Sequence, residues 1–146
     1  MKELFWDGLC VARALYESQM DAVSRAQDLA RVELDILLFL ANNPQFDTAT
    51  EIVQWRNISK AHVSQGVKAL EQRGYLERRY AGDNRRTIHL HLLEGAQAAV
   101  DAGRQAHARC LAALLDGFSA AECEQLRSYL SRISDNAWAQ MKKGDD

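Results

Sequence analysis

Hydrophobic residues along this 146-residue chain recur at a helical spacing except in one short stretch near its middle. From Leu4 to about Gln27 they return every three or four positions, as on one stripe of a long helix. The run from Arg31 to Ala41 is nearly all apolar and stops before the single proline, Pro44, which predicts a buried helix. Two more helical patterns follow residue 94, so the chain is expected to be mainly α-helical.

Two short helices are predicted between residues 48 and 73, each with its own start signal. Thr48 and Glu51 have the spacing of a capping box, which begins a helix that should run to about Trp55. Ser59 is a second N-cap, and Gly74 is a typical glycine at a helix C-terminus. The second of these helices has one predicted core face, made of Val63, Val67 and Leu70.

After Gly74 the hydrophobic period changes from helical to alternating. The segment 75–80, a turn at 82–84 and the apolar residues Ile88, Leu90 and Leu92 predict a β-hairpin. Two short helices followed by a hairpin form a winged helix-turn-helix. Such a unit lays its second helix in the major groove of DNA while the hairpin, or wing, reaches the neighbouring minor groove.

Charge is segregated along the chain, although the net charge is only −2. Between Gln54 and His91 there are eight Lys or Arg residues against three acids, and the two ends of the chain are acidic. A local basic field, and not the total charge, is what attracts phosphate groups. The pattern therefore predicts a nucleic-acid-binding face in the middle of the chain, with double-stranded DNA as the partner.

Three motifs closely resemble the MarR family of bacterial transcriptional regulators. They are the segments Ile58–Gln65, Leu70–Arg78 and Gly82–Arg86. The resemblance implies a homodimer held by the terminal helices, a palindromic operator, and a repressor that is released by a small phenolic or lipophilic ligand. The sequence departs from the family pattern at two places. Gln65 stands where an arginine is frequent, which should alter base preference. The segment Leu92–Gly95 lacks the usual threonine and is one residue short, so a rearranged start of the fifth helix is expected.

The DNA-contacting residues are expected on the outward side of the second short helix and at the tip of the wing. In the family, the acid of the wing orients an arginine that enters the minor groove, so the resemblance gives these roles to Asp83 and Arg85. A ligand pocket between the dimer arms and the winged domain would be lined by Trp6, Tyr16, Phe39 and Trp55. The expected DNA-binding set is Ser59, Lys60, Ala61, His62, Ser64, Gln65, Lys68, Asp83, Arg85 and Arg86.

The predicted organisation has three parts: a dimerisation helix over residues 1–30, the winged helix-turn-helix over 31–93, and two dimerisation helices over 94–146. The long terminal helices cannot all bury their apolar stripes against so small a core, and a second copy of the chain is the natural cover. No apolar run is long enough to span a bilayer and no signal peptide is visible, so a cytoplasmic protein without a membrane partner is expected.

Two alternative functions stay open from the sequence. Cys10 lies early in the first helix, as does the reactive cysteine of the peroxide-sensing branch of the same family, although an inert thiol is the simpler explanation. The second alternative is a winged-helix module that binds protein in place of DNA. The three cysteines, Cys10, Cys110 and Cys123, predict neither disulfides nor a metal site, and the chain has no phosphate loop or nucleophile motif, so neither a cofactor nor an enzyme is expected.

Overall fold

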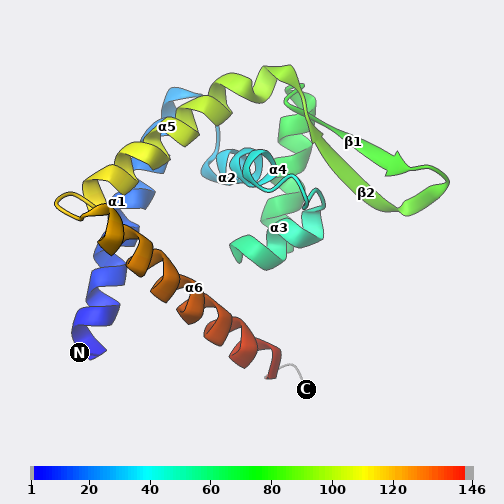
Figure 1. Ribbon diagram of the computed structural model, residues 1–146. Helices are drawn as coiled ribbons and strands as arrows, with labels where there is room; N and C mark the ends of the chain where they lie inside the picture. Colours follow the sequence, from blue (N-terminus) through cyan, green and yellow to red (C-terminus); the bar gives the residue numbers. More distant parts are fainter. Residues whose placement is uncertain (1, 144–146) are drawn as a thin grey trace. The chain divides into compact units, whose positions relative to one another are not determined.

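The structure of this protein is a computed structural model that describes residues 2–143. Its chain divides into two compact units, Met1–Cys110 and Leu111–Asp146 (Figure 1). The mainly α-helical fold with one β-hairpin is confirmed. In chain order the elements are α1 (Lys2–Ala26), α2 (Arg31–Asn42), α3 (Ala49–Arg56), α4 (Lys60–Gln72), β1 (Leu76–Ala81), β2 (Asn84–Leu92), a 3-10 helix (Glu94–Ala96), α5 (Gln97–Leu114) and α6 (Ala120–Lys143).

The core of the first unit is built around α2, whose apolar run is buried as expected. The helix ends where Asn43 donates from both its backbone amide and its side chain to the carbonyl of Phe39, one residue before Pro44. On one side α2 packs against α4 at Gly66, where a β-carbon would lie 2.7 Å from the Cδ1 atom of Ile36. A glycine at this point lets the two helices approach closely.

The two short helices begin and end at the residues that their capping signals indicate. The hydroxyl of Thr48 accepts from the amide of Glu51, whose carboxylate accepts in return from the amide of Thr48 at 2.9 Å. The turn into α4 is made by Asn57, which adopts a left-handed conformation with φ of 52°, and Ser59 then caps α4. After α4, Gly74 has φ of 73°, a conformation that glycine adopts without strain.

The hairpin is regular near the core and irregular at its tip. Pairing runs from Leu76 opposite Leu92 to Tyr80 opposite Ile88, after which Ala81 pairs with Asn84. Residues 85–87 therefore lie in a bulge on β2, beside the turn at 82–83. The base of the hairpin is also tied to the loop before α3, because the amide of Leu90 donates to the carbonyl of Asp47 at 2.7 Å.

The start of the fifth helix differs from a simple cap, in line with the shortened motif there. A 3-10 turn over Glu94–Ala96 precedes α5, and Leu93 provides no side-chain cap but donates its amide to the carbonyl of Tyr75 at 2.9 Å. Gly95 lies so close to the carbonyl of Gly74 that a β-carbon would be 3.2 Å from its oxygen. The absent threonine is thus replaced by close backbone packing against the start of the hairpin.

The second unit consists of the end of α5, a turn and α6. Ser119 and Glu122 form the predicted capping box of α6, with the Ser119 amide donating to the Glu122 carboxylate at 2.8 Å. No residue of α6 whose side chain is described is buried within the chain. None of the helices within residues 2–143 is both long and apolar enough to cross a membrane. The functional boundaries 1–30, 31–93 and 94–146 stay a prediction, since the two units are defined by compactness and divide the chain after Cys110.

Candidate nucleic-acid interface

Helix α4 has the two faces that its sequence predicts. Val63, Val67 and Leu70 are buried against the core, whereas Ala61, Gln65 and Lys68 lie exposed on the opposite side. All ten predicted DNA-contacting residues are in fact exposed, including those of the wing. An amphipathic helix with a polar outer face at the surface of the unit is the arrangement that major-groove binding requires.

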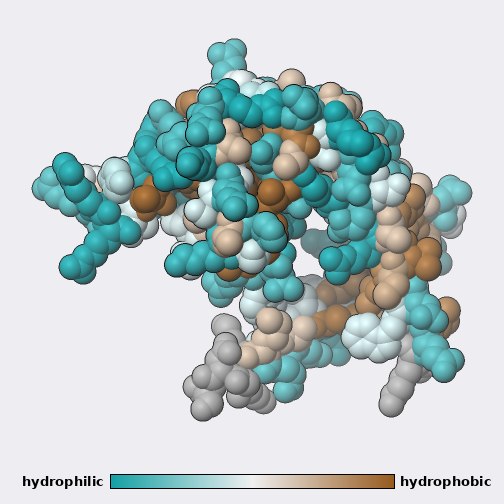
Figure 2. All heavy atoms as spheres, turned by 180° about the vertical axis from the view of Figure 1, so that it is seen from behind, coloured by the Kyte–Doolittle hydropathy of each residue, from teal (hydrophilic) through white to brown (hydrophobic). Residues whose placement is uncertain are grey.

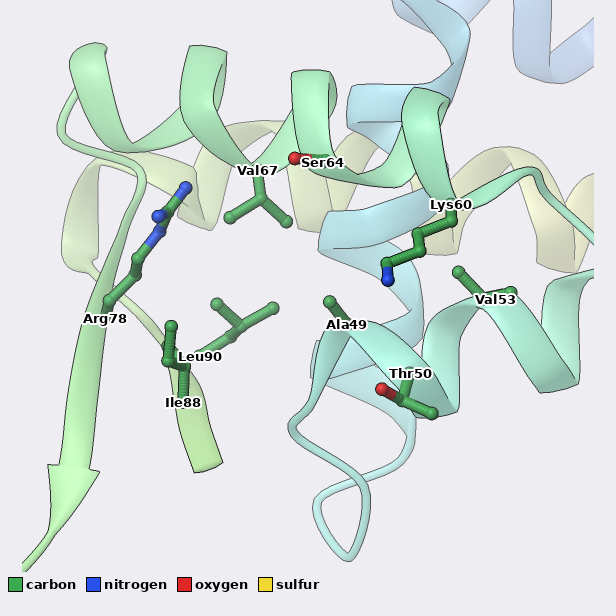
Figure 3. A pocket seen from close by; sticks show the side chains of 9 residues that line it. All are labelled: Ala49, Thr50, Val53, Lys60, Ser64, Val67, Arg78, Ile88 and Leu90. Atoms are coloured by element: carbon green, nitrogen blue, oxygen red, sulfur yellow. The ribbon is translucent and has the colours of Figure 1, made fainter. Parts of the chain in front are cut away.

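The structure divides the predicted residues of α4 into two groups. Figure 3 shows the side chains of Lys60 and Ser64 at one flank of the helix, beside a pocket enclosed by α3, α4 and the hairpin. Ala61, Gln65 and Lys68 are not among the residues that line it. The outer face of α4 is therefore narrower than expected, because two of the predicted DNA-contacting residues, Lys60 and Ser64, line the pocket.

This pocket has a volume of about 350 Å³, which suits a small molecule. Its walls are mainly aliphatic, and two cationic side chains, Lys60 and Arg78, stand at opposite sides of it (Figure 3). Arg78 also forms an ion pair with Glu71 at 3.3 Å. Sequence reasoning missed this site, since its nine residues come from four separate elements, α3, α4, β1 and β2: Ala49, Thr50, Val53, Lys60, Ser64, Val67, Arg78, Ile88 and Leu90.

Several arginines of the basic cluster have partners within the first unit. Arg73 donates to the carbonyl of Asp28 and stacks over the ring of Tyr75, and Arg79 pairs with Glu77. Arg56 lies over the ring of Phe39 and is itself exposed. These contacts fix the arginines in place but leave the local excess of positive charge unchanged, because Glu77 is one of the three acids already counted against the eight basic residues.

Basic side chains that are free to contact phosphate lie on the outer face of α4 and at the wing tip. Among residues 2–143, no ion pair involves Lys68, Arg85 or Arg86. Within the described residues, Asp83 and Arg85 form neither an ion pair nor a side-chain hydrogen bond with each other. The tip is instead fixed by Asn84, whose side-chain oxygen accepts from the amide of Arg86 at 3.0 Å. The role of Asp83 as an orienting acid stays a prediction, and Asn84 is the tip residue that the sequence did not single out.

Residues that hold the hairpin in place were also missed by the sequence. His89 lies on the half-exposed side of β2, where its Nδ1 atom is 2.8 Å from a carboxylate oxygen of Asp47. Together with the bond from Leu90 to the Asp47 carbonyl, this contact fixes the base of the wing to the loop before α3. The only sequence signal was the position of His89 on the polar side of an alternating strand.

The four aromatic residues predicted to line a ligand pocket do not form one group. Phe39 is buried and stacks on Phe46, which in turn stacks on Trp55, with ring centroids 6.3 and 5.3 Å apart. Tyr16 lies on α1 beneath Arg31, and Trp6, near the start of α1, is 63% exposed and packs against its neighbour Phe5. Their part in ligand binding stays a prediction, and none of the four lines the pocket beside α4.

A charged network joins α1 to α2 behind these aromatic residues. Arg31 is bound to Glu17, Asp21 and Asp35, with nitrogen to oxygen distances of 2.7, 3.0 and 3.0 Å. Burial raises the pKa of Asp35 despite the neighbouring guanidinium. Burial, together with the carboxylate of Asp35, also raises the pKa of Tyr16. The network holds the first helix against the winged domain.

The cysteines add no further site that the structure supports. Cys10 is exposed on α1, Cys110 is buried and Cys123 is half-buried, and all three are free thiols. Within residues 2–143, no three His, Cys, Asp or Glu residues are placed to hold a metal ion. Peroxide sensing by Cys10 stays a prediction.

Comparison with known proteins agrees with this geometry. Residues 27–87 match the model of the MarR family, whereas no curated protein matches the chain. Among solved structures, a transcriptional regulator from Listeria monocytogenes assigned to the MarR family and complexed with 26mer DNA has a TM-score of 0.81 at 24% identity, covering 99% of this chain and 97% of its own.

Two further structures share the fold. A MarR family regulator from Silicibacter pomeroyi has a TM-score of 0.79 at 15% identity, with 93% of this chain and 94% of its own covered. A SlyA-like transcription regulator from Listeria monocytogenes has a TM-score of 0.78 at 24% identity, with 99% and 97% covered. The chain thus has the fold of MarR family transcriptional regulators, and its residues 27–87 match the model of that family.

Proposed function

We propose that this protein is a cytoplasmic transcriptional regulator, acting as a repressor, whose homodimer binds a palindromic operator. The observation that carries the proposal is the exposed outer face of α4, with Gln65 and Lys68, together with a wing whose tip exposes Arg85 and Arg86. A dimer would place two copies of α4 in successive major grooves, about one helical turn apart. Arg85 would enter the minor groove beside each half-site.

The apolar surface of the terminal helices supports the dimer. On α1 the side chains of Leu4 and Val11 are 78% and 71% exposed, and in the second unit Tyr129, Leu130 and Ile133 are also exposed. Figure 2 shows such hydrophobic side chains at the surface of both helices, whereas the far end of the hairpin is hydrophilic. Exposed apolar stripes of this length are covered by a partner in stable proteins, and a second copy is the partner that is always present.

Release from DNA by a small phenolic or lipophilic ligand is supported by the pocket beside α4. Its aliphatic walls would bind an aromatic ring, while Lys60 and Arg78 would bind a phenolate or carboxylate. Because Lys60 and Ser64 belong to α4, a ligand there would alter the contacts of this helix with DNA. Thr50→Trp would fill the pocket from α3 as a ligand does, and we expect this variant to bind DNA more weakly than the wild type and to show no further loss when phenolic compounds are added.

The proposal is tested by measuring binding of the purified protein to fragments of DNA from upstream of its own gene. We expect a specific complex whose affinity falls steeply with salt, since cationic side chains displace counterions from phosphate. The mass of the complex should correspond to two protein chains per site. If no duplex is bound, either in these fragments or in a random pool, the surface would belong to a protein-binding module and the proposal would be wrong.

A further inference from the structure

The first turn of α4 contains a side-chain pair that does more than cap the helix. The hydroxyl oxygen of Ser59 accepts from the backbone amide of His62 at 3.2 Å, which is an ordinary N-cap bond. The same oxygen lies 2.8 Å from the Nδ1 atom of the His62 ring. Both residues are exposed, so the ring is held at one nitrogen and presents the other, Nε2, to the surroundings.

The protons of this pair can be assigned from its chemistry. A serine hydroxyl has one hydrogen to donate, and the Ser59 oxygen already accepts from an amide, so the hydroxyl hydrogen is available for Nδ1. We assign this hydrogen to the bond with Nδ1, so that the ring accepts at Nδ1 and carries its own hydrogen on Nε2. His62 therefore offers a hydrogen-bond donor, and not an acceptor, at the exposed end of its ring.

The two residues before His62 in the first turn of α4 offer no other polar group on the same surface. Lys60 turns toward the pocket beside α3, and Ala61 has no polar group (Figure 3). Residues at the N-terminal end of a recognition helix are those that reach base edges in the major groove. His62 is thus the polar side chain of this turn that is placed and oriented to contact a base.

We propose that His62 is a specificity-determining residue that selects guanine in each half-site, and that Ser59 is its positioning residue. The inference rests on the proposed DNA-binding function. Guanine presents two acceptors, N7 and O6, on its major-groove edge, which suits a lone donor. Adenine places a donor beside its N7 atom, and cytosine presents a donor alone. Thymine has one acceptor, O4, next to a methyl group, so guanine is the base with two acceptors for the Nε2 hydrogen.

The test is selection of bound duplexes from a random pool by the wild type and three variants of the full-length protein. His62→Ala removes the ring. Ser59→Gly removes the hydroxyl but costs the helix cap only a few tenths of a kcal/mol, whereas Ser59→Thr retains both the cap and the hydroxyl and is the matched control. Affinity for a random duplex is measured in parallel, because loss of folding would lower this affinity too.

We expect the wild type to enrich a motif with one guanine per half-site that His62→Ala no longer selects. The preference there should fall by about tenfold, with the other positions unchanged. Ser59→Gly should weaken the same position and Ser59→Thr should retain it.

Three outcomes would overturn the inference. If His62→Ala enriches the wild-type motif, or loses affinity equally for all sequences, His62 does not select a base. If Ser59→Gly and Ser59→Thr behave alike, Ser59 does not position the ring. A wild type that enriches no motif at all would overturn the proposed function itself, and this inference with it.

Discussion

Packing between α2 and α5 depends on Gly103, and adding one methyl group there should destabilise the protein. A β-carbon at position 103 would lie 2.7, 2.8 and 3.1 Å from the Cδ2, Cδ1 and Cγ atoms of Leu38. Leu38 is only 6% exposed, and three of its atoms are involved, so a rotation of one terminal methyl group cannot relieve the contact. Gly103→Ala must therefore shift either the Leu38 side chain or the helix.

The expected magnitude follows from two opposing effects. Overpacking a well-filled core costs about 1–3 kcal/mol. Alanine in place of glycine in a helix interior returns roughly 0.8–1.0 kcal/mol. The net change in the free energy of unfolding should be a loss of about 1 kcal/mol, or on the order of 2–4 °C in the melting temperature for a chain of this size.

Gly8 provides the matched control, because it also lies within a helix but has nothing within 4 Å of its added β-carbon. Gly8→Ala should stabilise the protein slightly by helix propensity alone. Both variants would be unfolded with heat and urea, followed by circular dichroism, at one fixed protein concentration, since dimer formation would make stability depend on concentration. If Gly103→Ala were as stable as Gly8→Ala, the close contact with Leu38 would not exist and the packing argument would be wrong.

Two further predictions concern charge and assembly. Burial raises the pKa of Asp35, so the carboxyl group holds a proton more tightly in the folded protein than in the unfolded chain. Its contribution to stability is therefore complete below the ordinary aspartate pKa of about 3.9, and it is lost as the pH rises through the pKa of the folded state. The stability of Asp35→Asn relative to wild type should therefore increase from acid to neutral pH in urea unfolding, and a constant difference would contradict the pKa shift. For assembly, Ile133→Glu should convert a dimer to a monomer in light scattering, because burial of an isoleucine contributes roughly 1.5–3 kcal/mol in each of two copies. Ser131→Glu adds the same charge to a neighbouring exposed position and should leave the dimer intact; equal masses for the two variants would argue against α6 as the interface.

The helices and the hairpin could be predicted because their signals are local. Capping pairs such as Thr48 with Glu51 and Ser119 with Glu122 act within one helical turn, and the change of period after Gly74 marks the hairpin directly. The two faces of α4 follow from its spacing alone. These features depend on neighbours in sequence, so no knowledge of the tertiary structure was needed.

The features that could not be predicted all depend on residues distant in sequence. The bond from Arg73 to the Asp28 carbonyl, the contact of His89 with Asp47, and the turn of Lys60 toward the pocket each need the packed fold to be known. The pocket itself joins four elements, none of which carries a ligand motif of its own. Likewise, the hydrogen bond from Ser59 to the His62 ring depends on a rotamer that the capping pattern does not specify.

The central claim is that the outer face of α4 and the wing tip bind DNA, and the salt dependence of binding by Arg85→Ala tests it most directly. For B-DNA, each phosphate charge that a cationic side chain no longer neutralises reduces the slope of log affinity against log salt concentration by about 0.9. An arginine in the minor groove lies between the phosphates of both strands, so a dimer that lacks two such arginines should lose about 1.8. Arg25→Ala, which removes an exposed charge at the end of α1, should keep the wild-type slope. Unchanged affinity and slope for Arg85→Ala would contradict the account and exclude the wing from the DNA interface.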